Sequence, residues 1–304
     1  FGHKQQHEVR MKNREGAAGG RFAPSFFGGY MVFRRKDIGN SNIHYRFYPF
    51  STFLEHQRRL GFEKITLFGG TPHVWIDAYG ATDGEKIKKE AEDQGLSING
   101  FMPEFSSMRY TLGSEGGSEQ KTWEYLRRCL DFTAKLECGS MIVTANGYLL
   151  DRTEEERDRR LKEALRRLGE MAGSYDIRLI LLNQHEDATN RIRTIEDMKR
   201  AMEWADGVNV EVGVDTASVY EAGETLKEWL EAFGTRLTYV NLSNSKFDGG
   251  RYYWGDGYLN LRDILEALEE GAYAGAISCH YMIRDYLSKP WAADESSARM
   301  ISWI

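Results

Sequence analysis

The stretch of residues 140–182 reads SMIVTANGYLLDRTEEERDRRLKEALRRLGEMAGSYDIRLILL. It begins and ends with a short apolar run, whereas its middle is long and highly charged. Within the middle, Leu161, Leu165 and Leu168 recur every three or four residues, which is the spacing of one apolar helix face. Short apolar runs of this kind are typical of buried parallel strands. The stretch therefore predicts a strand, a helix and a second strand.

The same alternation continues along the rest of the chain. Short apolar runs bounded by polar residues or glycine predict strands at residues 22–27, 64–68, 97–102, 140–144, 178–182, 208–214, 237–242 and 276–279. Amphipathic segments predict helices at residues 84–94, 118–136, 153–172, 194–205, 225–233 and 261–270, and from residue 291 onward. Thr153 with Glu156, and Thr194 with Asp197, match the pattern of a helix-capping box.

Strands that alternate with helices in this way favour one closed barrel over an open sheet. We predict the α/β class and a single (β/α)8 TIM barrel over residues 21–304, preceded by a flexible lead-in at residues 1–20. No Gly-x-Gly-x-x-Gly motif follows the first predicted strand, so no nucleotide cofactor is expected. The active site of such a barrel lies at the ends of its strands, and the residues there decide the function.

Composition and charge exclude several classes of protein. The 304 residues carry a formal net charge of -6, spread along the chain, which provides no basic surface for nucleic acid. No apolar run approaches the roughly 18 residues that a membrane-spanning helix requires. The first residues lack the apolar core of a secretory signal. Three cysteines without metal-like spacing indicate a reducing compartment, so we expect a cytoplasmic protein.

Polar side chains follow the predicted strands, at the end of the barrel where a site is expected. They are His73, Glu104, Asn146, His185, Asp215, Asn241, Asn244 and His280, and a later loop adds Trp254 and Asp256. A convergent ring of polar groups is what a pocket for a small polar ligand requires.

In order and spacing, these residues resemble the sugar isomerase/epimerase family. That family includes ketohexose 3-epimerases, hydroxypyruvate isomerases and the fructoselysine 3-epimerase type, all built on a xylose isomerase-like barrel. The resemblance runs from about residue 22 to about residue 299. It is carried by Gly28-Gly29-Tyr30-Met31, Gly69-Gly70-Thr71-Pro72-His73, Pro103-Glu104, Ala145-Asn146-Gly147-Tyr148, Val214-Asp215 and Trp254-Gly255-Asp256-Gly257.

The resemblance implies one divalent ion held by a Glu, an Asp, a His and a second Glu at the ends of strands five to eight. The two glutamates of the family move a proton on and off carbon. In this chain the four positions correspond to Leu182, Asp215, Asn241 and His280. Thr189-Asn190 supports the placement of Leu182, because the family has a Ser/Thr-Asn pair at the same distance. The resemblance thus implies a largely replaced metal site, with Mn, Mg or Zn weakly bound or absent.

Asp215 and His280 are the candidate catalytic residues and the candidate metal ligands. His280 is a candidate general base or acid, and the alternative is a buried core histidine. For Asp215 the alternative is a carboxylate bound to loop amides. His185 is a candidate replacement ligand or a surface loop histidine, and Trp254 is a candidate platform for a sugar ring or a packed aromatic side chain. The predicted substrate-binding residues are His73, Glu104, Asn146, His185, Asn241, Asn244, Trp254 and Asp256.

The leading expectation is a carbohydrate-active protein that acts on or binds a monosaccharide or a keto-sugar derivative. Ordinary two-glutamate epimerisation is disfavoured, and a divergent reaction such as elimination next to a carbonyl is open. The alternative is an inactive pseudoenzyme that serves as a sugar-binding or assembly subunit. An endonuclease for damaged DNA shares the barrel but requires a multi-metal cluster and a basic groove. The resemblance also implies a homo-oligomer or a hetero-oligomeric subunit.

Overall fold

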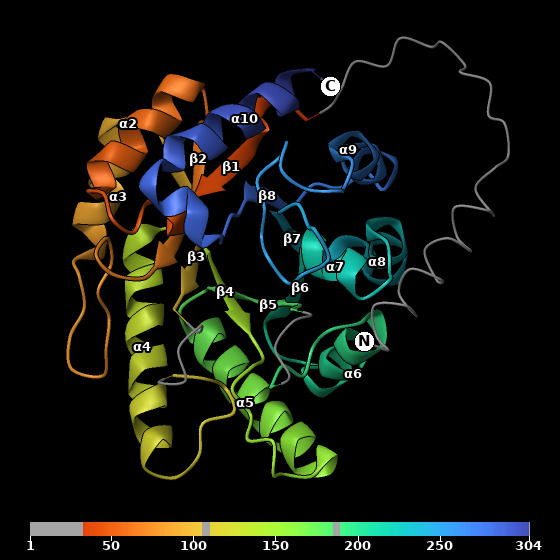
Figure 1. The fold of residues 1–304 in the computed structure, drawn as a ribbon. Helices are drawn as coiled ribbons and strands as arrows, with labels where there is room; N and C mark the ends of the chain where they lie inside the picture. The colour runs from red at the N-terminus through yellow and green to blue at the C-terminus, as the bar shows by residue number, and fades with distance from the viewer. Residues whose placement is uncertain (1–32, 105–109, 185–188, 304) are drawn as a thin grey trace, which may run out of the picture. The chain divides into compact units, whose positions relative to one another are not determined.

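The computed structural model describes residues 33–104, 110–184 and 189–303. They form a closed barrel of eight parallel strands in chain order, in which β8 pairs with β1 (Figure 1). The strands are β1 Ile38–Ser41, β2 Lys64–Gly69, β3 Ser97–Pro103, β4 Ser140–Thr144, β5 Arg178–Leu182, β6 Val210–Asp215, β7 Leu237–Leu242 and β8 Ala276–Cys279. The predicted single (β/α)8 TIM barrel is therefore confirmed.

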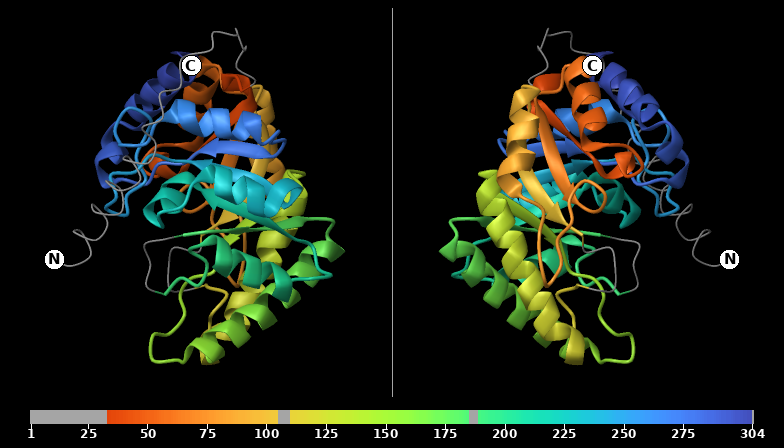
Figure 2. Two further views of the ribbon diagram at one scale, coloured as in Figure 1. Left: turned by 90° about the vertical axis from the view of Figure 1, so that its right-hand side faces the viewer. Right: turned by 90° about the vertical axis from the view of Figure 1, so that its left-hand side faces the viewer.

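The helices lie outside the strands, as the two side views in Figure 2 show. The α-helices are α2 Phe50–Leu60, α3 Gly84–Asp93, α4 Glu119–Leu136, α5 Glu154–Ser174, α6 Ile195–Trp204, α7 Thr216–Glu221, α8 Leu226–Phe233, α9 Leu261–Glu270 and α10 Pro290–Trp303. The 3-10 helices are η1 Arg35–Asp37, η2 Ile43–Tyr45, η3 Gly116–Ser118, η4 Gly234–Arg236 and η5 Arg284–Ser288. Within the described part of the chain, no helix combines the length and the apolar character that crossing a bilayer requires.

The first strand of the barrel lies later in the chain than predicted. Residues 22–27, like Gly28-Gly29-Tyr30-Met31, lie outside the described residues, and β1 takes the first place in the barrel. β1 reads Ile-Gly-Asn-Ser, so its sequence has one large apolar residue and no apolar run. It is nevertheless fully buried, because it pairs with β2 on one side and β8 on the other. The other predicted strands are confirmed to within two residues.

Apolar side chains fill the interior of the barrel. Met102, Ile142, Ile180, Leu182 and Tyr239 form one buried cluster contributed by β3, β4, β5 and β7. Interior layers of this kind make a TIM barrel a packed core with its site at one mouth. Because Leu182 belongs to this cluster, it contributes packing to the site above it and no ligand atom.

A buried carboxylate joins the two ends of the described chain. Asp294 on α10 is 0% exposed and accepts hydrogen bonds from His44 Nε2 at 2.7 Å, Asn40 Nδ2 at 2.8 Å, Tyr45 OH at 2.7 Å and Gln57 Nε2 at 2.8 Å. These donors come from β1, η2 and α2. We call this set the Asp294 seam. A buried charge is tolerated only when it is paired and hydrogen-bonded, and the seam meets that condition.

Candidate active site at the barrel mouth

The four positions of the implied metal site all face the interior at the carboxyl ends of β5 to β8. Asp215 and Asn241 are register partners on adjacent strands, so their side chains share one face. Asn241 in turn pairs with Ser278, two residues before His280, and Leu182 lies in the interior cluster. The structure therefore brings these predicted residues to one mouth of the barrel.

Both oxygens of the Asp215 carboxylate already have partners within the protein. Its Oδ1 accepts a hydrogen bond of 2.9 Å from the backbone N–H of Ser218 and lies 2.8 Å from Arg251 Nε. Its Oδ2 accepts a hydrogen bond of 2.8 Å from Ser243 Oγ. Asp215 caps the amino terminus of α7, which explains the contact with Ser218. At 2% exposure it has little contact with solvent.

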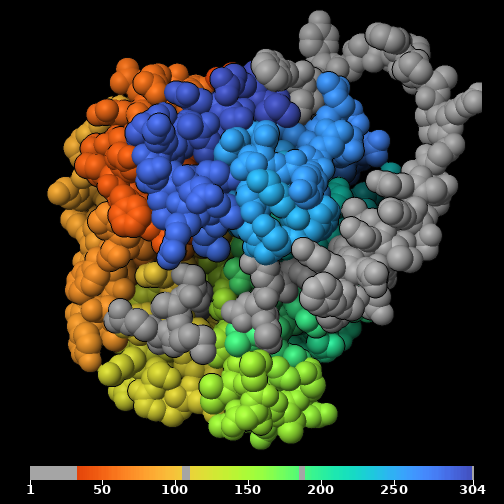
Figure 3. Space-filling model, viewed as in Figure 1, coloured from red at the N-terminus to blue at the C-terminus, as the bar shows by residue number. Residues whose placement is uncertain are grey.

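Arg251 is the residue that sequence reasoning missed. It lies in the loop between β7 and α9, and a backbone bridge to Met282 fixes it beside the segment after β8. Figure 3 shows the segments after β7 (light blue) and after β8 (dark blue) side by side on the visible face. Its guanidinium contacts Asp215, Ser218 and Glu221, the last at 3.7 Å. An arginine at 6% exposure is buried only because carboxylates surround it.

His280 is buried at 6% exposure, and its Nδ1 has no hydrogen-bond partner among the described residues. Burial lowers the pKa of His280 to about 4, with Asp215 opposing the change and Arg251 and His44 adding to it. The imidazole is therefore neutral near pH 7. A base with so low a pKa is weak, which argues against the predicted role of general base.

Asn241 is also engaged within the barrel. Its Oδ1 accepts a hydrogen bond of 2.7 Å from Tyr239 OH, and the same hydroxyl reaches Thr66 Oγ1 on β2 at 3.2 Å. Asn241 is 2% exposed, and its side-chain oxygen is bound to Tyr239 in the interior of the barrel. Its predicted contact with substrate hydroxyls has no support in this geometry.

These side chains do not fit a divalent ion. Asp215 is bound by Arg251, the side chain of Leu182 is a hydrocarbon, and Asn241 Oδ1 already accepts a hydrogen bond from Tyr239. A +2 ion about 4 Å from the guanidinium would be repelled by on the order of 8 kcal/mol at an effective dielectric of about 20. Within the described residues, no three His, Cys, Asp or Glu side chains form a group that could hold a metal ion.

A cavity of about 360 Å³ opens at the carboxyl ends of β1, β2 and β3 and beside the segment after β8. We call it the mouth cavity. Its lining residues are Asn42, Ile43, Arg46, Phe47, Phe68, Gly70, Thr71, Pro72, His73, Glu104 and Met282. Its volume is in the range of roughly 300–1,000 Å³ that is common for small-molecule sites. It contains two predicted residues, His73 and Glu104.

Two charged side chains line the mouth cavity. Glu104 follows β3 and is half-buried, and Arg46 follows η2 and is exposed. Neither side chain has an ion-pair or hydrogen-bond partner among residues 33–104, 110–184 and 189–303. By contrast, His73 is fixed, since its Nδ1 accepts a hydrogen bond from Asn42 and its Nε2 donates to the carbonyl of Tyr48, both at 2.8 Å. Burial lowers the pKa of His73, which keeps the ring neutral.

The predicted residues after β7 support the loop instead of facing a ligand. Trp254 is 0% exposed, and its Nε1 donates to the carbonyl of Leu242, so the indole has no free face for a sugar. Asn244 Oδ1 accepts the backbone N–H groups of Ser245 and Leu259, both at 2.8 Å. Trp254 and Asn244 were predicted to bind substrate from their place in the chain, but their hydrogen bonds stabilise the loop.

Asp256 connects the loop between β7 and α9 to η5. Its Oδ2 accepts a hydrogen bond of 2.7 Å from Tyr286 OH, and its Oδ1 pairs with Lys246. Burial would raise the pKa of Asp256, but the hydrogen bonds from Lys246 and Tyr286 outweigh it and hold the pKa below its usual range. Asp256 therefore remains charged and paired, away from the residues that line the mouth cavity.

Two further predictions concern β4 and β5. Asn146 follows β4, is buried, and donates from Nδ2 to Gln184 Oε1 at 3.2 Å. It does not line the mouth cavity. His185 lies outside the described residues, so its predicted role as a replacement ligand stays a prediction.

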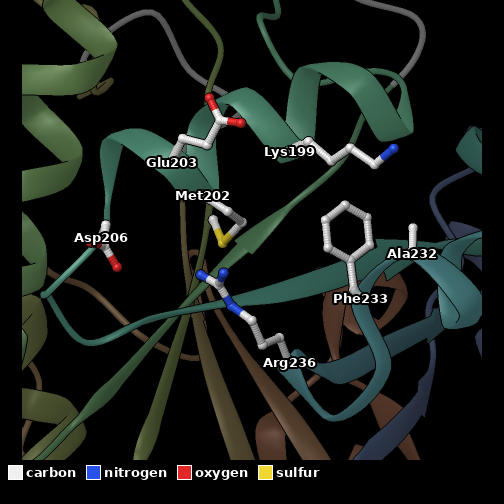
Figure 4. Close-up of a pocket in the computed structure, with 7 residues that line it drawn as sticks. All are labelled: Lys199, Met202, Glu203, Asp206, Ala232, Phe233 and Arg236. Carbon is white, nitrogen blue, oxygen red and sulfur yellow. The ribbon is translucent and has the colours of Figure 1, made fainter.

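A larger hollow of about 450 Å³ lies on the outer surface between α6 and the η4 corner. Figure 4 shows Arg236 reaching toward Met202, with Glu203 and Asp206 nearby on the α6 side. Arg236 comes just before β7, so this hollow is at the amino-terminal end of the barrel. Active sites of TIM barrels lie at the opposite end, and we therefore base the site on the mouth cavity despite its smaller volume.

A closed parallel barrel with a polar cavity at the carboxyl ends of its strands defines a TIM barrel with a candidate ligand site at its mouth. The chain belongs to the xylose isomerase-like TIM barrel family, whose model matches residues 54–303. The family-level resemblance predicted from the sequence is therefore confirmed.

Relatives and solved structures agree with this assignment. Fructoselysine 3-epimerase of Escherichia coli O157:H7 is 24% identical over 248 residues, which cover 78% of this chain and 88% of the relative. Inosose dehydratase of Bacillus licheniformis is 25% identical over 228 residues, covering 60% and 75%. The structure of 3-keto-D-glucoside 4-epimerase from E. coli has a TM-score of 0.70 at 18% identity, covering 88% of this chain and 98% of that one. At this identity the last similarity concerns the fold alone.

Proposed function

We propose that this protein is a carbohydrate-active member of the family, which binds a monosaccharide or a keto-sugar derivative in the mouth cavity without a divalent ion on Asp215. The observation that carries the proposal is the cavity itself, which places Glu104 and Arg46 at the carboxyl ends of the strands. Relatives named fructoselysine 3-epimerase and inosose dehydratase support the ligand class.

The lining of the mouth cavity suits a polyhydroxylated ligand with a carbonyl group. The Glu104 carboxylate accepts hydrogen bonds from hydroxyls, and the Arg46 guanidinium donates to carbonyl or hydroxyl oxygens. Phe47 and Met282 are 72% and 42% exposed, and they offer apolar surface for the C–H face of a sugar. Such a lining, apolar with a few convergent polar groups, is the usual composition of a small-molecule site.

For turnover we propose that Glu104 removes a proton from the carbon next to the carbonyl. The bond electrons pass to the carbonyl oxygen, and the Arg46 guanidinium stabilises the resulting enediolate. The proton then returns from Glu104 to carbon, or the neighbouring C–O bond breaks and Glu104 gives the proton to the departing hydroxyl, which leaves as water. This route uses neither of the family's two glutamates, whose positions hold Leu182 and His280.

A second candidate function is the inactive sugar-binding or assembly subunit. The enclosed state of Asp215 and His280 favours it, because both predicted catalytic groups have little access to a ligand. Oligomer formation stays a prediction, which light scattering of the purified chain tests. The cytoplasmic location also stays a prediction. All three cysteines are free thiols, which is typical of proteins in a reducing compartment.

The test is calorimetric titration of ketohexoses, ketopentoses and their acid derivatives into protein kept in EDTA. We expect saturable binding that weakens at least about tenfold in Glu104→Gln and Arg46→Ala, the loss of one charged hydrogen-bond partner. Arg236→Ala, at the opposite end of the barrel, is the matched control and should bind normally. Absence of binding by every sugar would contradict the proposal.

Proton exchange separates the two candidates. In D2O, an active protein exchanges the proton on the carbon next to the carbonyl, which NMR detects as loss of that signal. Exchange that disappears in Glu104→Gln supports the catalytic route. Saturable binding without exchange supports the subunit.

A further inference from the structure

The mouth of the barrel contains two buried carboxylates that the proposed function does not use. Asp215 and Glu221 are 2% and 4% exposed, and both lie against Arg251. Burial raises the pKa of Glu221, whereas Arg251 and the hydroxyl of Ser245 oppose that change. Two carboxylates removed from water require a positive charge nearby, since an uncompensated buried anion is strongly destabilising.

Arg251 meets this requirement from inside the chain. Its Nε lies 2.8 Å from Asp215 Oδ1, its Nη1 lies 3.7 Å from Glu221 Oε2, and its Nη1 also donates to the carbonyl of Gly249 at 2.9 Å. The planar fork of a guanidinium suits such a site, because it spans several acceptors at once. The backbone bridge to Met282 holds the residue at this position.

The position is the one at which the family's ion would bind. Asp215 is the retained acidic residue of the implied ligand set, and its register partner Asn241 pairs in turn with Ser278, two residues before His280. The ring of His280 is 6% exposed, with Nδ1 unpartnered among the described residues. A cation therefore belongs at this point of the fold, and in this chain the cation is a side chain.

We propose that Arg251 replaces the divalent ion as the positive charge at the barrel mouth, and that its guanidinium closes an acidic cation site formed by Asp215 and Glu221. The inference extends the proposed function, which requires only that sugar binding proceeds without the ion. It predicts a specific consequence: removing the guanidinium leaves two carboxylate ligands, which hard divalent cations such as Mn²⁺ prefer.

The experiment measures Mn²⁺ binding to the full chain by electron paramagnetic resonance and by thermal melting. The native protein should show no saturable binding up to about 1 mM Mn²⁺, and its Tm should not move. Arg251→Ala should bind about one equivalent, with a Tm that rises with Mn²⁺ concentration, as linkage requires. The double variant Arg251→Ala/Asp215→Asn should lose at least about tenfold in that affinity.

Two variants control the result. Arg251→Gln keeps much of the side chain and its hydrogen-bonding capacity without the charge, and it is measured as well in case Arg251→Ala does not fold. Arg236→Ala removes an exposed arginine at the other end of the barrel and should acquire no Mn²⁺ binding. Native protein that binds one equivalent of Mn²⁺ overturns the proposal, and so do charge-removing variants that bind none or that bind independently of Asp215. Sugar binding measured in EDTA is unaffected by either outcome, so the two proposals fail separately.

Discussion

Asp294 and Asp215 are both buried carboxylates, at 0% and 2% exposure, yet they belong to different kinds of region. Asp294 lies in the seam that ties α10 to β1 and α2, and its donors are a histidine, a tyrosine and two amides. Asp215 lies at the barrel mouth, and its partners include the guanidinium of Arg251. One carboxylate ties α10 to β1, η2 and α2, and the other lies at the position for which the resemblance implies an ion.

A residue's place in a family motif does not by itself determine which partners its side chain binds. Burial would raise the pKa of Asp294, but the His44 ring and the hydrogen bonds outweigh it and hold the pKa below its usual range. At Asp215 the same problem of a buried charge is solved by an arginine from a loop. In both regions protein groups surround the carboxylate: Asp294 accepts four hydrogen bonds, and Asp215 accepts two and pairs with Arg251.

The largest effect is expected in the seam. Asp294→Ala removes the acceptor that His44, Tyr45 and the two amides share, and it should lower the free energy of unfolding by about 4 kcal/mol. Urea denaturation measures this change. The neighbouring Glu295→Ala is the control, because Glu295 pairs with Arg59 at the solvent-exposed surface and its loss should cost less than about 1 kcal/mol. Equal losses in the two variants would contradict the role of the seam.

The pH response should separate the two regions next. The pKa of His280 is about 4, so between pH 6.5 and 4 the unfolded chain binds a proton that the folded chain does not. The free energy of unfolding should therefore fall as the pH falls through that window, by on the order of 3 kcal/mol. Asp215, Arg251 and His44 are the charged or titratable groups that act on this ring, and burial is the main cause.

His280→Gln should remove the fall in the free energy of unfolding between pH 6.5 and 4, because glutamine does not titrate. The seam behaves differently: the pKa of Asp294 is below its usual range, so its contribution is present above about pH 4 and is lost only at lower pH. Urea denaturation of the native protein and of His280→Gln at pH 7, 5.5 and 4 checks both statements. Parallel pH profiles for the two proteins would contradict them.

A smaller effect is expected from one partner of Asp215. Ser243→Ala removes the hydrogen bond from Ser243 Oγ to Asp215 Oδ2 and should cost about 1–2 kcal/mol, since the oxygen is left buried and unpaired. Ser174→Ala, at an exposed helix end, is the matched control and should change stability by less than about 0.5 kcal/mol. A loss no greater than that of the control would remove Ser243 from the network.

The smallest effect lies outside both regions. Thr153 caps α5 by accepting the backbone N–H of Glu156 at 3.2 Å, and the Glu156 side chain returns a bond to the Thr153 N–H at 3.0 Å. Thr153→Ala should cost about 1 kcal/mol, the usual value for an N-cap. Thermal melting of Thr153→Ala measures the stability lost with an exposed polar contact, for comparison with Ser243→Ala. A cost above that of Ser243→Ala would weaken the claim that burial makes the mouth contacts matter.

Local sequence patterns were sufficient for most of the fold. The runs at residues 64–68 and 178–182 are apolar because both faces of each strand are covered, and they match β2 and β5. The capping boxes at Thr153 and Thr194 are local, and both are confirmed. β1 was missed because its burial comes from its neighbours on both sides, and its own sequence, Ile-Gly-Asn-Ser, is ordinary for a loop.

The site was less predictable, because its interactions join distant residues. Position in the barrel placed Asp215 and His280 correctly at the mouth, since register follows from the strands. Arg251 is 36 residues away from Asp215 in a loop, and no periodicity marks it. Trp254 has the composition of a sugar platform, and only its burial shows that it packs. His44 and Asp294 are separated by 250 residues, so the seam has no local signal.

Anomalous diffraction from crystals of the native chain grown with Mn²⁺ decides whether Arg251 or a metal ion neutralises Asp215. We expect no manganese peak near Asp215, with the guanidinium of Arg251 2.8 Å from that carboxylate. A manganese peak bonded to Asp215, with Arg251 displaced from it, would show that the ion and not the guanidinium holds this position.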